Sequence, residues 1–321
     1  MKFKSVLPLT LATLPLLASS QIGVTARIKP LRSPSLSGLK SPFFHRQSSA
    51  ANQCDIGCSP SPDGCICGGS RSDETAFIFA DIPYLISPRS TNILDGNPLL
   101  RWYPVEGATS YRVRVKRGNG ELIWEVAEVR ETEVRYGGEI PLEPGVYDVI
   151  VNVNDTGASS AEEELKGWKF RVLGDPDREE IQSLATQQTR GLTGEAKVLA
   201  LAEFYASKEL YADAIALLES RIAEGSATAR VYHQLGDRYR DIRFPPLAAE
   251  YYLEAIAQMP TDAIAETAEL QGKLGTVYRL LQEPDKAINQ LQQAQANYQT
   301  LGNSRRAGEL QVQIEQIQRD R

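Results

Sequence analysis

The chain has 321 residues and a net charge of −6, because 41 Asp and Glu outnumber 35 Lys and Arg. An acidic balance argues against nucleic-acid binding, which needs clustered cations. After the first 20 or so residues, no apolar stretch is long enough to cross a bilayer, so we expect no integral membrane segment in the mature chain.

The first 26 residues have the pattern of a secretory signal peptide. Lys2 and Lys4 precede an apolar run over 6–18, and small residues follow at 19–20 and 25–26. This order predicts cleavage near residue 20 or 26. No cysteine follows directly, so we expect no bacterial lipid anchor at this site. The sequence thus predicts export to the periplasm or another extracytoplasmic compartment, or secretion.

The next segment, 27–53, is rich in proline and serine and basic in charge. Residues 1–53 contain seven Lys and Arg and no acidic residue, which leaves −13 for residues 54–321. Such a composition favours a disordered linker. Contact of this basic tail with an anionic surface, such as lipid headgroups or wall polymers, is the alternative.

All four cysteines, Cys54, Cys58, Cys65 and Cys67, lie in the segment 54–82. A clustered, even set in an exported chain indicates two disulfides. Cys65 and Cys67 are too close to pair with each other. Two pairings remain: 54–65 with 58–67, or 54–67 with 58–65. A metal or iron–sulfur site is the alternative. Paired zinc-binding cysteines are usually separated by two to four residues, and only Cys54 and Cys58 have this spacing, whereas Cys65 and Cys67 do not. Free or intermolecular thiols are the third possibility.

Residues 83–173 alternate between apolar and polar side chains, which is the period of half-buried strands. The run 111–116 shows the alternation, and 147–151 and 168–172 repeat it. A Gly-Asn-Gly turn at 118–120 predicts a hairpin between 110–117 and 121–127. About seven strands of this kind predict a β-sandwich.

The segment 100–113, with Trp102 and Tyr111, resembles the second and third strands of fibronectin type III domains, where a tryptophan and a tyrosine share the core. The Pro-Gly-Val-Tyr sequence at 144–147 resembles the entry to a later strand of that family. A generic immunoglobulin-like sandwich fits nearly as well. The resemblance implies a spacer or adhesion module. Trp102, Trp124 and Trp168 could form a sugar-binding platform, but core packing is favoured.

An Asp-Pro pair at 175–176 predicts a helix over about 176–188, within a linking segment at 174–192. Beyond it, one frame recurs three times: a small residue, a tyrosine three positions later, and an alanine nine positions after that. The members of the frame are Ala202, Tyr205 and Ala214; Gly236, Tyr239 and Ala248; and Gly275, Tyr278 and Ala287. The alanines are 34 and then 39 positions apart, so five residues are inserted before the third copy.

This frame resembles the tetratricopeptide repeat (TPR), a helix pair of about 34 residues. The resemblance covers three units, 195–228, 229–262 and 268–301, within 193–302. Copy one departs from the family at Arg221, where alanine is preferred. Copy three has Gln299 in place of the terminal proline. The segment 303–321 is expected to be the capping helix that an array needs. The predicted fold is thus multidomain, an all-β sandwich followed by an all-α array of helical hairpins.

The resemblance implies that the first helix of each pair lines a partner-binding groove. Matching the family's inward positions gives Ala196, Leu199, Glu203 and Ala206 in copy one, Arg230, His233, Asp237 and Arg240 in copy two, and Glu269, Gly272, Thr276 and Arg279 in copy three. The lysine and asparagine with which one subgroup clamps a peptide carboxylate are missing at these positions. Some groove residues could instead pair internally, as Arg240 with Asp237 at spacing i, i+3.

No catalytic or phosphate-binding motif is present, and one of only two histidines, His45, lies in the tail. We therefore expect no enzyme, no cofactor and no metal. The leading hypothesis is an exported adaptor that binds a protein or peptide of the cell envelope through the repeats. One alternative is a structural or adhesive protein that binds glycans. The other is a cysteine-based redox or metal-binding protein.

Overall fold

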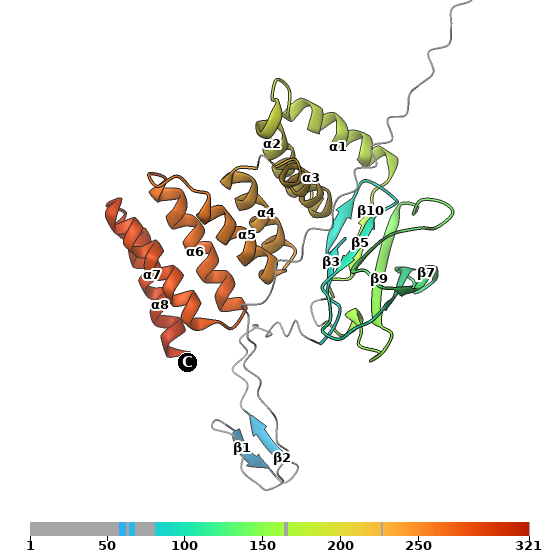
Figure 1. Cartoon of the computed structure of the whole chain (residues 1–321), viewed down its shortest axis with the longest axis horizontal. Coiled ribbons are helices and arrows are strands. Elements are labelled where there is room, and N and C mark those ends of the chain that lie inside the picture. The colour runs from blue at the N-terminus through green and yellow to red at the C-terminus, as the bar shows by residue number, and fades with distance from the viewer. Residues whose placement is uncertain (1–57, 62–63, 68–80, 164–165, 226, 321) are drawn as a thin grey trace, which may run out of the picture. The chain divides into compact units, whose positions relative to one another are not determined.

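A computed structural model of the chain describes residues 58–61, 64–67, 81–163, 166–225 and 227–320 (Figure 1). The chain divides into two compact units, 1–68 and 69–321. The predicted signal peptide, the basic linker and Cys54 lie outside the described residues, so those expectations stay predictions.

The described part of the first unit is a small antiparallel hairpin. Its strands are β1 (Cys58–Ser61) and β2 (Gly64–Cys67). The register sets the backbone of Cys58 opposite that of Cys67, and Pro60 opposite Cys65. Because Cys54 is not described, both disulfide pairings stay open.

The second unit begins with a β region of two sheets. The strands are β3 (Leu85–Ser87), β4 (Thr91–Ile93), β5 (Leu99–Trp102), β6 (Tyr111–Arg117), β7 (Leu122–Val129), β8 (Glu133–Arg135), β9 (Gly145–Val153) and β10 (Lys169–Val172). One sheet has the order β4-β10-β9-β6-β7, and the other has the order β3-β5-β8. All pairs are antiparallel except β4 with β10. The expected strand region is therefore confirmed.

Both sheets contribute to one hydrophobic core. The alternation seen in the sequence is the alternation of burial, with Val149 and Val151 on β9 fully buried between half-exposed neighbours. Trp102 is only 1% exposed and meets the Tyr111 ring edge-on, with 5.3 Å between centroids. A three-tryptophan sugar platform is therefore not formed. Gly120, with φ of +92°, makes the β6–β7 turn that the Gly-Asn-Gly sequence predicts.

Eight helices follow, and Figure 1 shows them in chain order from yellow-green to red. They are α1 (Asp175–Gln188), α2 (Gly194–Ser207), α3 (Tyr211–Ala223), α4 (Ala229–Asp241), α5 (Pro245–Ala257), α6 (Ile264–Leu280), α7 (Pro284–Thr300) and α8 (Ser304–Arg319). Pro245 and Pro284 open α5 and α7, where a missing N–H costs nothing. We call α2 to α7 the repeat array, because α2 packs on α3, α4 on α5 and α6 on α7; α8 packs on α7.

The glycines of the frame permit close packing of the two helices in a pair. An added Cβ at Gly236 would lie 2.6 Å from the ring of Tyr252, four positions beyond the frame alanine. At Gly275 it would lie 2.6 Å from Leu291 and 3.2 Å from the backbone oxygen of Ala287. Each of these two glycines therefore mainly receives a large side chain from the next helix.

A left-handed backbone conformation recurs at the same spacing as the frame. In each turn between the two helices of a pair, one residue adopts a left-handed conformation: Glu209 (φ 58°), Arg243 (φ 56°) and Gln282 (φ 56°). These residues are 34 and 39 positions apart, like the alanines. None is glycine, so no local residue pattern predicts the left-handed conformation of these turns.

Four of the five residues inserted before the third copy lengthen its first helix, α6, rather than forming a loop. Helix α6 has 17 residues, whereas α4 has 13, and α7 exceeds α5 by the same amount. The N-cap of α6 is Ala263, and no side chain caps the helix. The additional turn extends α6 at its N-terminus.

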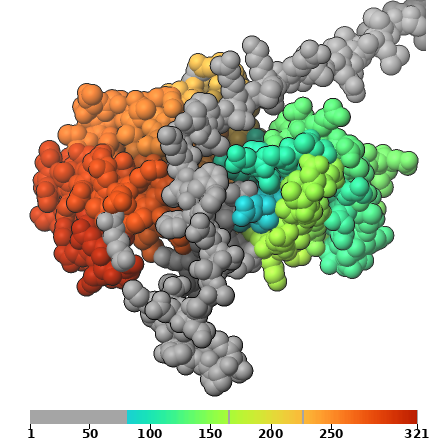
Figure 2. All heavy atoms as spheres, turned by 60° about the horizontal axis from the view of Figure 1, so that its bottom comes forward, coloured from blue at the N-terminus to red at the C-terminus, as the bar shows by residue number. Residues whose placement is uncertain are grey.

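In Figure 2 the atoms of α6 to α8, orange to red, form one continuous surface.

Within the described residues, no helix is long and apolar enough to cross a membrane.

Candidate functional site

The residues matched to the family groove lie on α2, α4 and α6. These are the first, or A, helices of the three pairs. We call the matched residues other than Ala196 and Ala206 the A-helix face: Leu199, Glu203, Arg230, His233, Asp237, Arg240, Glu269, Gly272, Thr276 and Arg279. Spacings of three and four residues place the members of each helix on one side of it. Contacts between the helices then decide whether the three sides join.

Asp237 is the centre of this face. It accepts a hydrogen bond from the Tyr252 hydroxyl at 2.6 Å, and Lys273 Nζ lies 3.1 Å from each of its carboxylate oxygens. The Arg240 guanidinium lies 3.5 Å away, which is the internal pair that the sequence offered as the alternative. Lys273 also lies 2.7 Å from His233 Nε2. Lys273 thus joins α4 to α6.

The electrostatics of this cluster fix the charge of each group. Burial and the nearby Lys273 ammonium lower the pKa of His233, so the imidazole is neutral and can accept from Lys273. Burial opposes ionisation of Asp237, but the Tyr252 hydrogen bond and the Lys273 charge outweigh it and hold the pKa of that carboxyl below its usual value.

Helix α2 joins the face through a second contact. Glu203 lies 3.5 Å from Arg238, whose other terminal nitrogen is 3.2 Å from Asp241. Arg238 is buried, whereas Glu203 is exposed. Polar contacts therefore connect the first helices of the three repeats, α2 to α4 and α4 to α6.

The outer members of the A-helix face are open to solvent. Arg230 and Arg279 are exposed, and so is Thr276, whose hydroxyl donates to the Gly272 carbonyl at 3.2 Å. Among the described residues, Arg230 makes no ion pair or hydrogen bond through its side chain. Leu199 is half-buried and packs against the core of the array.

Sequence reasoning missed a second polar cluster, which connects the β region to the repeat array. Arg101 on β5 forms a bidentate ion pair with Glu219 on α3, with N–O distances of 2.8 and 3.0 Å. The hydroxyl of Tyr239, the tyrosine of the second frame, donates to Glu219 at 2.6 Å and accepts from Arg101 at 3.0 Å. Arg101 and Glu219 lie 118 positions apart. No local pattern could have linked them.

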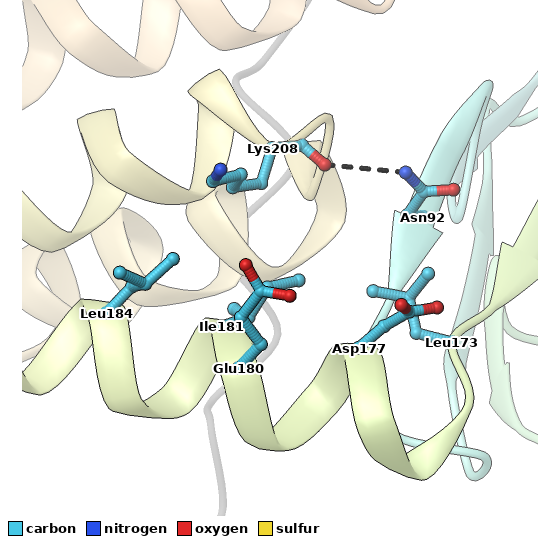
Figure 3. A pocket seen from close by; sticks show the side chains of 7 residues that line it. All are labelled: Asn92, Leu173, Asp177, Glu180, Ile181, Leu184 and Lys208. Atoms are coloured by element: carbon cyan, nitrogen blue, oxygen red, sulfur yellow. Dashed lines mark hydrogen bonds between the residues drawn. The ribbon is translucent and has the colours of Figure 1, made fainter.

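A hollow of about 200 Å³ lies between β4, α1 and the turn after α2 (Figure 3). Its lining residues are Asn92, Leu173, Asp177, Glu180, Ile181, Leu184 and Lys208. Asn92 donates across it to the Lys208 carbonyl at 3.4 Å. None of the residues predicted to bind a partner lies there.

Comparisons with known proteins give no family assignment. No protein-family model matches the chain, and no curated protein matches it. Three similar solved structures are the MamA protein (20% identity, 45% of this chain and 86% of that one, TM-score 0.31), the Yersinia enterocolitica type III secretion translocator chaperone SycD (16%, 39% and 83%, 0.34) and PcrH in complex with the chaperone binding region of PopB (16%, 38% and 98%, 0.33). At these scores the likenesses carry no argument about this chain's partner or activity.

Proposed function

We propose that the chain is a non-catalytic scaffold whose repeat array holds a protein or peptide segment against the A-helix face. The observation that supports this proposal is that polar contacts connect the first helices of all three repeats. The Lys273 contacts join α6 to α4, and the Glu203–Arg238 pair joins α4 to α2. The central charges neutralise one another, and Arg230 and Thr276 are exposed in the outer part of the face.

A position-specific crosslink tests this proposal. His233 and Arg240 are unsuitable for it, because both contact Asp237 and their removal would disturb the network. A photo-crosslinking amino acid at Thr276 should capture a discrete partner. The same group at Gln292, which is exposed on α7, should not. Arg230→Glu should reduce capture at Thr276 severalfold. Equal products from positions 276 and 292 would contradict the assignment.

The β region is proposed to be a sandwich of the fibronectin type III or immunoglobulin type that supports the array. Three observations support this. The sheet orders are β3-β5-β8 and β4-β10-β9-β6-β7, the Trp102–Tyr111 pair lies in the shared core, and the Tyr147 hydroxyl donates to the Glu143 carbonyl at 2.9 Å. The last contact resembles the tyrosine corner of such sandwiches. An experimental structure of the β region would test the assignment.

Export and two disulfides complete the proposal, on the sequence pattern of residues 1–67. Mass spectrometry of the mature protein tests both. We expect an N-terminus near residue 21 or 27 and a mass four hydrogens below that of the reduced chain. An uncleaved N-terminus or four free thiols would contradict this part of the proposal, without affecting the A-helix face.

A further inference from the structure

The hairpin of the first unit carries three of the four cysteines on its two strands (Figure 1). Its register sets the backbone of Cys58 directly opposite that of Cys67, and the backbone of Pro60 directly opposite that of Cys65. Cys67 is therefore the direct cross-strand neighbour of Cys58, whereas Cys65 is only a diagonal neighbour. This difference bears on the two disulfide pairings that the sequence leaves open.

The proline in this hairpin shows which kind of pair the cysteines belong to. Directly opposite residues of an antiparallel ladder alternate between pairs that exchange two hydrogen bonds and pairs that exchange none. Pro60 has no N–H, so its pair with Cys65 is of the second kind. The pair of Cys58 with Cys67 lies two residues further along each strand, so it is of the second kind as well. The Cα atoms of such a pair are about 4.5 Å apart.

This separation suits a disulfide, whereas the diagonal separation does not. The Cα atoms that a disulfide joins are usually about 4.4 to 6.8 Å apart. Diagonal neighbours across two strands are about 7–8 Å apart, so a bond between Cys58 and Cys65 would require the backbone to move. Of the two pairings, only the one that joins Cys58 to Cys67 fits the register of the hairpin.

We propose that Cys58 and Cys67 form a disulfide across the hairpin, which leaves Cys54 to pair with Cys65. The proposal rests on the export and the two disulfides proposed above, and it decides between their two connectivities. In each bond two thiols lose two protons and two electrons, and their sulfur atoms join. The electrons pass to a disulfide oxidant of the extracytoplasmic compartment, which takes up two protons and becomes two thiols.

The bond between Cys58 and Cys67 makes the hairpin a covalently closed unit. An isolated two-stranded hairpin is at best marginally stable in water, and these strands have four residues each. The cross-link stabilises the paired strands by restricting the unfolded chain. With all four sulfur atoms in disulfides, none is a thiolate, which is the form of cysteine that binds a metal.

Disulfide mapping of the full chain, purified without reductant, tests the pairing. Trypsin releases all four cysteines in the peptide 47–71, and cleavage before Asp55 and Asp63 then splits this peptide between its cysteines. Cys65 and Cys67 stay together in the last fragment. Electron-transfer fragmentation of the backbone between these two cysteines shows to which fragment each is joined.

We expect Cys67 to be joined to the fragment with Cys58, and Cys65 to the fragment with Cys54. A bond between Cys58 and Cys65, or between Cys54 and Cys58, would overturn this pairing while leaving the two proposed disulfides in place. Four free thiols would contradict the disulfides themselves, and the pairing with them.

Two matched variants measure the preference of Cys58 for its partner. Cys54→Ser with Cys65→Ser keeps Cys58 and Cys67, whereas Cys54→Ser with Cys67→Ser keeps Cys58 and Cys65. In the same glutathione redox buffer, the first variant should show on the order of tenfold more disulfide relative to thiol. Equal ratios, or a higher ratio in the second variant, would overturn the proposal.

Discussion

Arg89 and Glu163 form an ion pair inside the second unit, 74 positions apart in the sequence. Both terminal nitrogens of the guanidinium, Nη1 and Nη2, contact the carboxylate, and the two side chains are only 1% and 2% exposed. Arg89 Nε also donates to the Ile242 carbonyl at 2.7 Å, at the end of α4. This one arginine therefore connects the loop after β3, the segment before β10 and the repeat array.

Removing Arg89 should destabilise the second unit strongly. Arg89→Ala leaves Glu163 buried without its cation, which costs about 3–5 kcal/mol. Arg112→Ala breaks the exposed pair with Glu125 and should cost about 1 kcal/mol or less. Urea unfolding followed by circular dichroism measures both. Equal midpoints for the two variants would show that the buried pair does not stabilise the contact between the β region and the array.

The close approach at Gly236 gives the second prediction. Gly236→Ala places a methyl group against Tyr252, whose ring is fully buried and whose hydroxyl is held by Asp237. Overpacking should cost about 1–3 kcal/mol, partly offset by the roughly 1 kcal/mol that alanine gains over glycine in a helix.

Gly308 is the matched control for that substitution, because an added Cβ there meets no atom within 4 Å. Gly308→Ala in α8 should therefore stabilise the chain by about 0.5–1 kcal/mol. Thermal unfolding distinguishes the two directions. A stabilising Gly236→Ala would mean that the helix pair can separate without cost.

The third prediction concerns the charge of His233. Burial and Lys273 lower the pKa of its imidazole, so an NMR titration should give a value below the ordinary 6.5. Lys273→Met removes the neighbouring cation and leaves Asp237, and the pKa of His233 should then rise. Arg305→Met, an exposed change on α8, should have no effect. An unchanged value in Lys273→Met would disprove the contact between α4 and α6.

The fourth prediction is a pH dependence at Asp213, in the first turn of α3. Burial raises the pKa of this carboxyl to about 7, and its Oδ2 atom has no hydrogen-bond partner among the described residues. Unfolding returns the pKa to the ordinary 3.8. Between these values the folded chain holds a proton that the unfolded chain releases. Stability should therefore fall as the pH rises from about 4 to 7.

Asp213→Asn tests this linkage, because the amide keeps an acceptor oxygen and cannot ionise. The variant should match the parent near pH 4 and exceed its free energy of unfolding by about 2–4 kcal/mol at pH 8. Other titrating groups contribute equally to both proteins and cancel in the difference. A difference that stays constant across this range would contradict the raised pKa.

The sequence by itself determined the local features of this protein. A 34-residue frame, a Gly-Asn-Gly turn and prolines at helix starts act within a few residues of the chain, so the repeat pairs and the β6–β7 hairpin follow from periodicity and turn chemistry. The same spacing put His233, Asp237 and Arg240 on one side of α4. Lys273 was missed, although its spacing of four from Glu269 was a usable signal.

Only the tertiary structure decided which surfaces meet. Arg89 reaches Glu163 and Ile242, and Arg101 reaches Glu219 and Tyr239, across 74 to 153 positions of sequence. Such pairings depend on how the sheets and helices pack in three dimensions, and periodicity carries no information about that. For the same reason, the sequence predicted the strand β7, but only the sheet order placed it at the end of the five-stranded sheet.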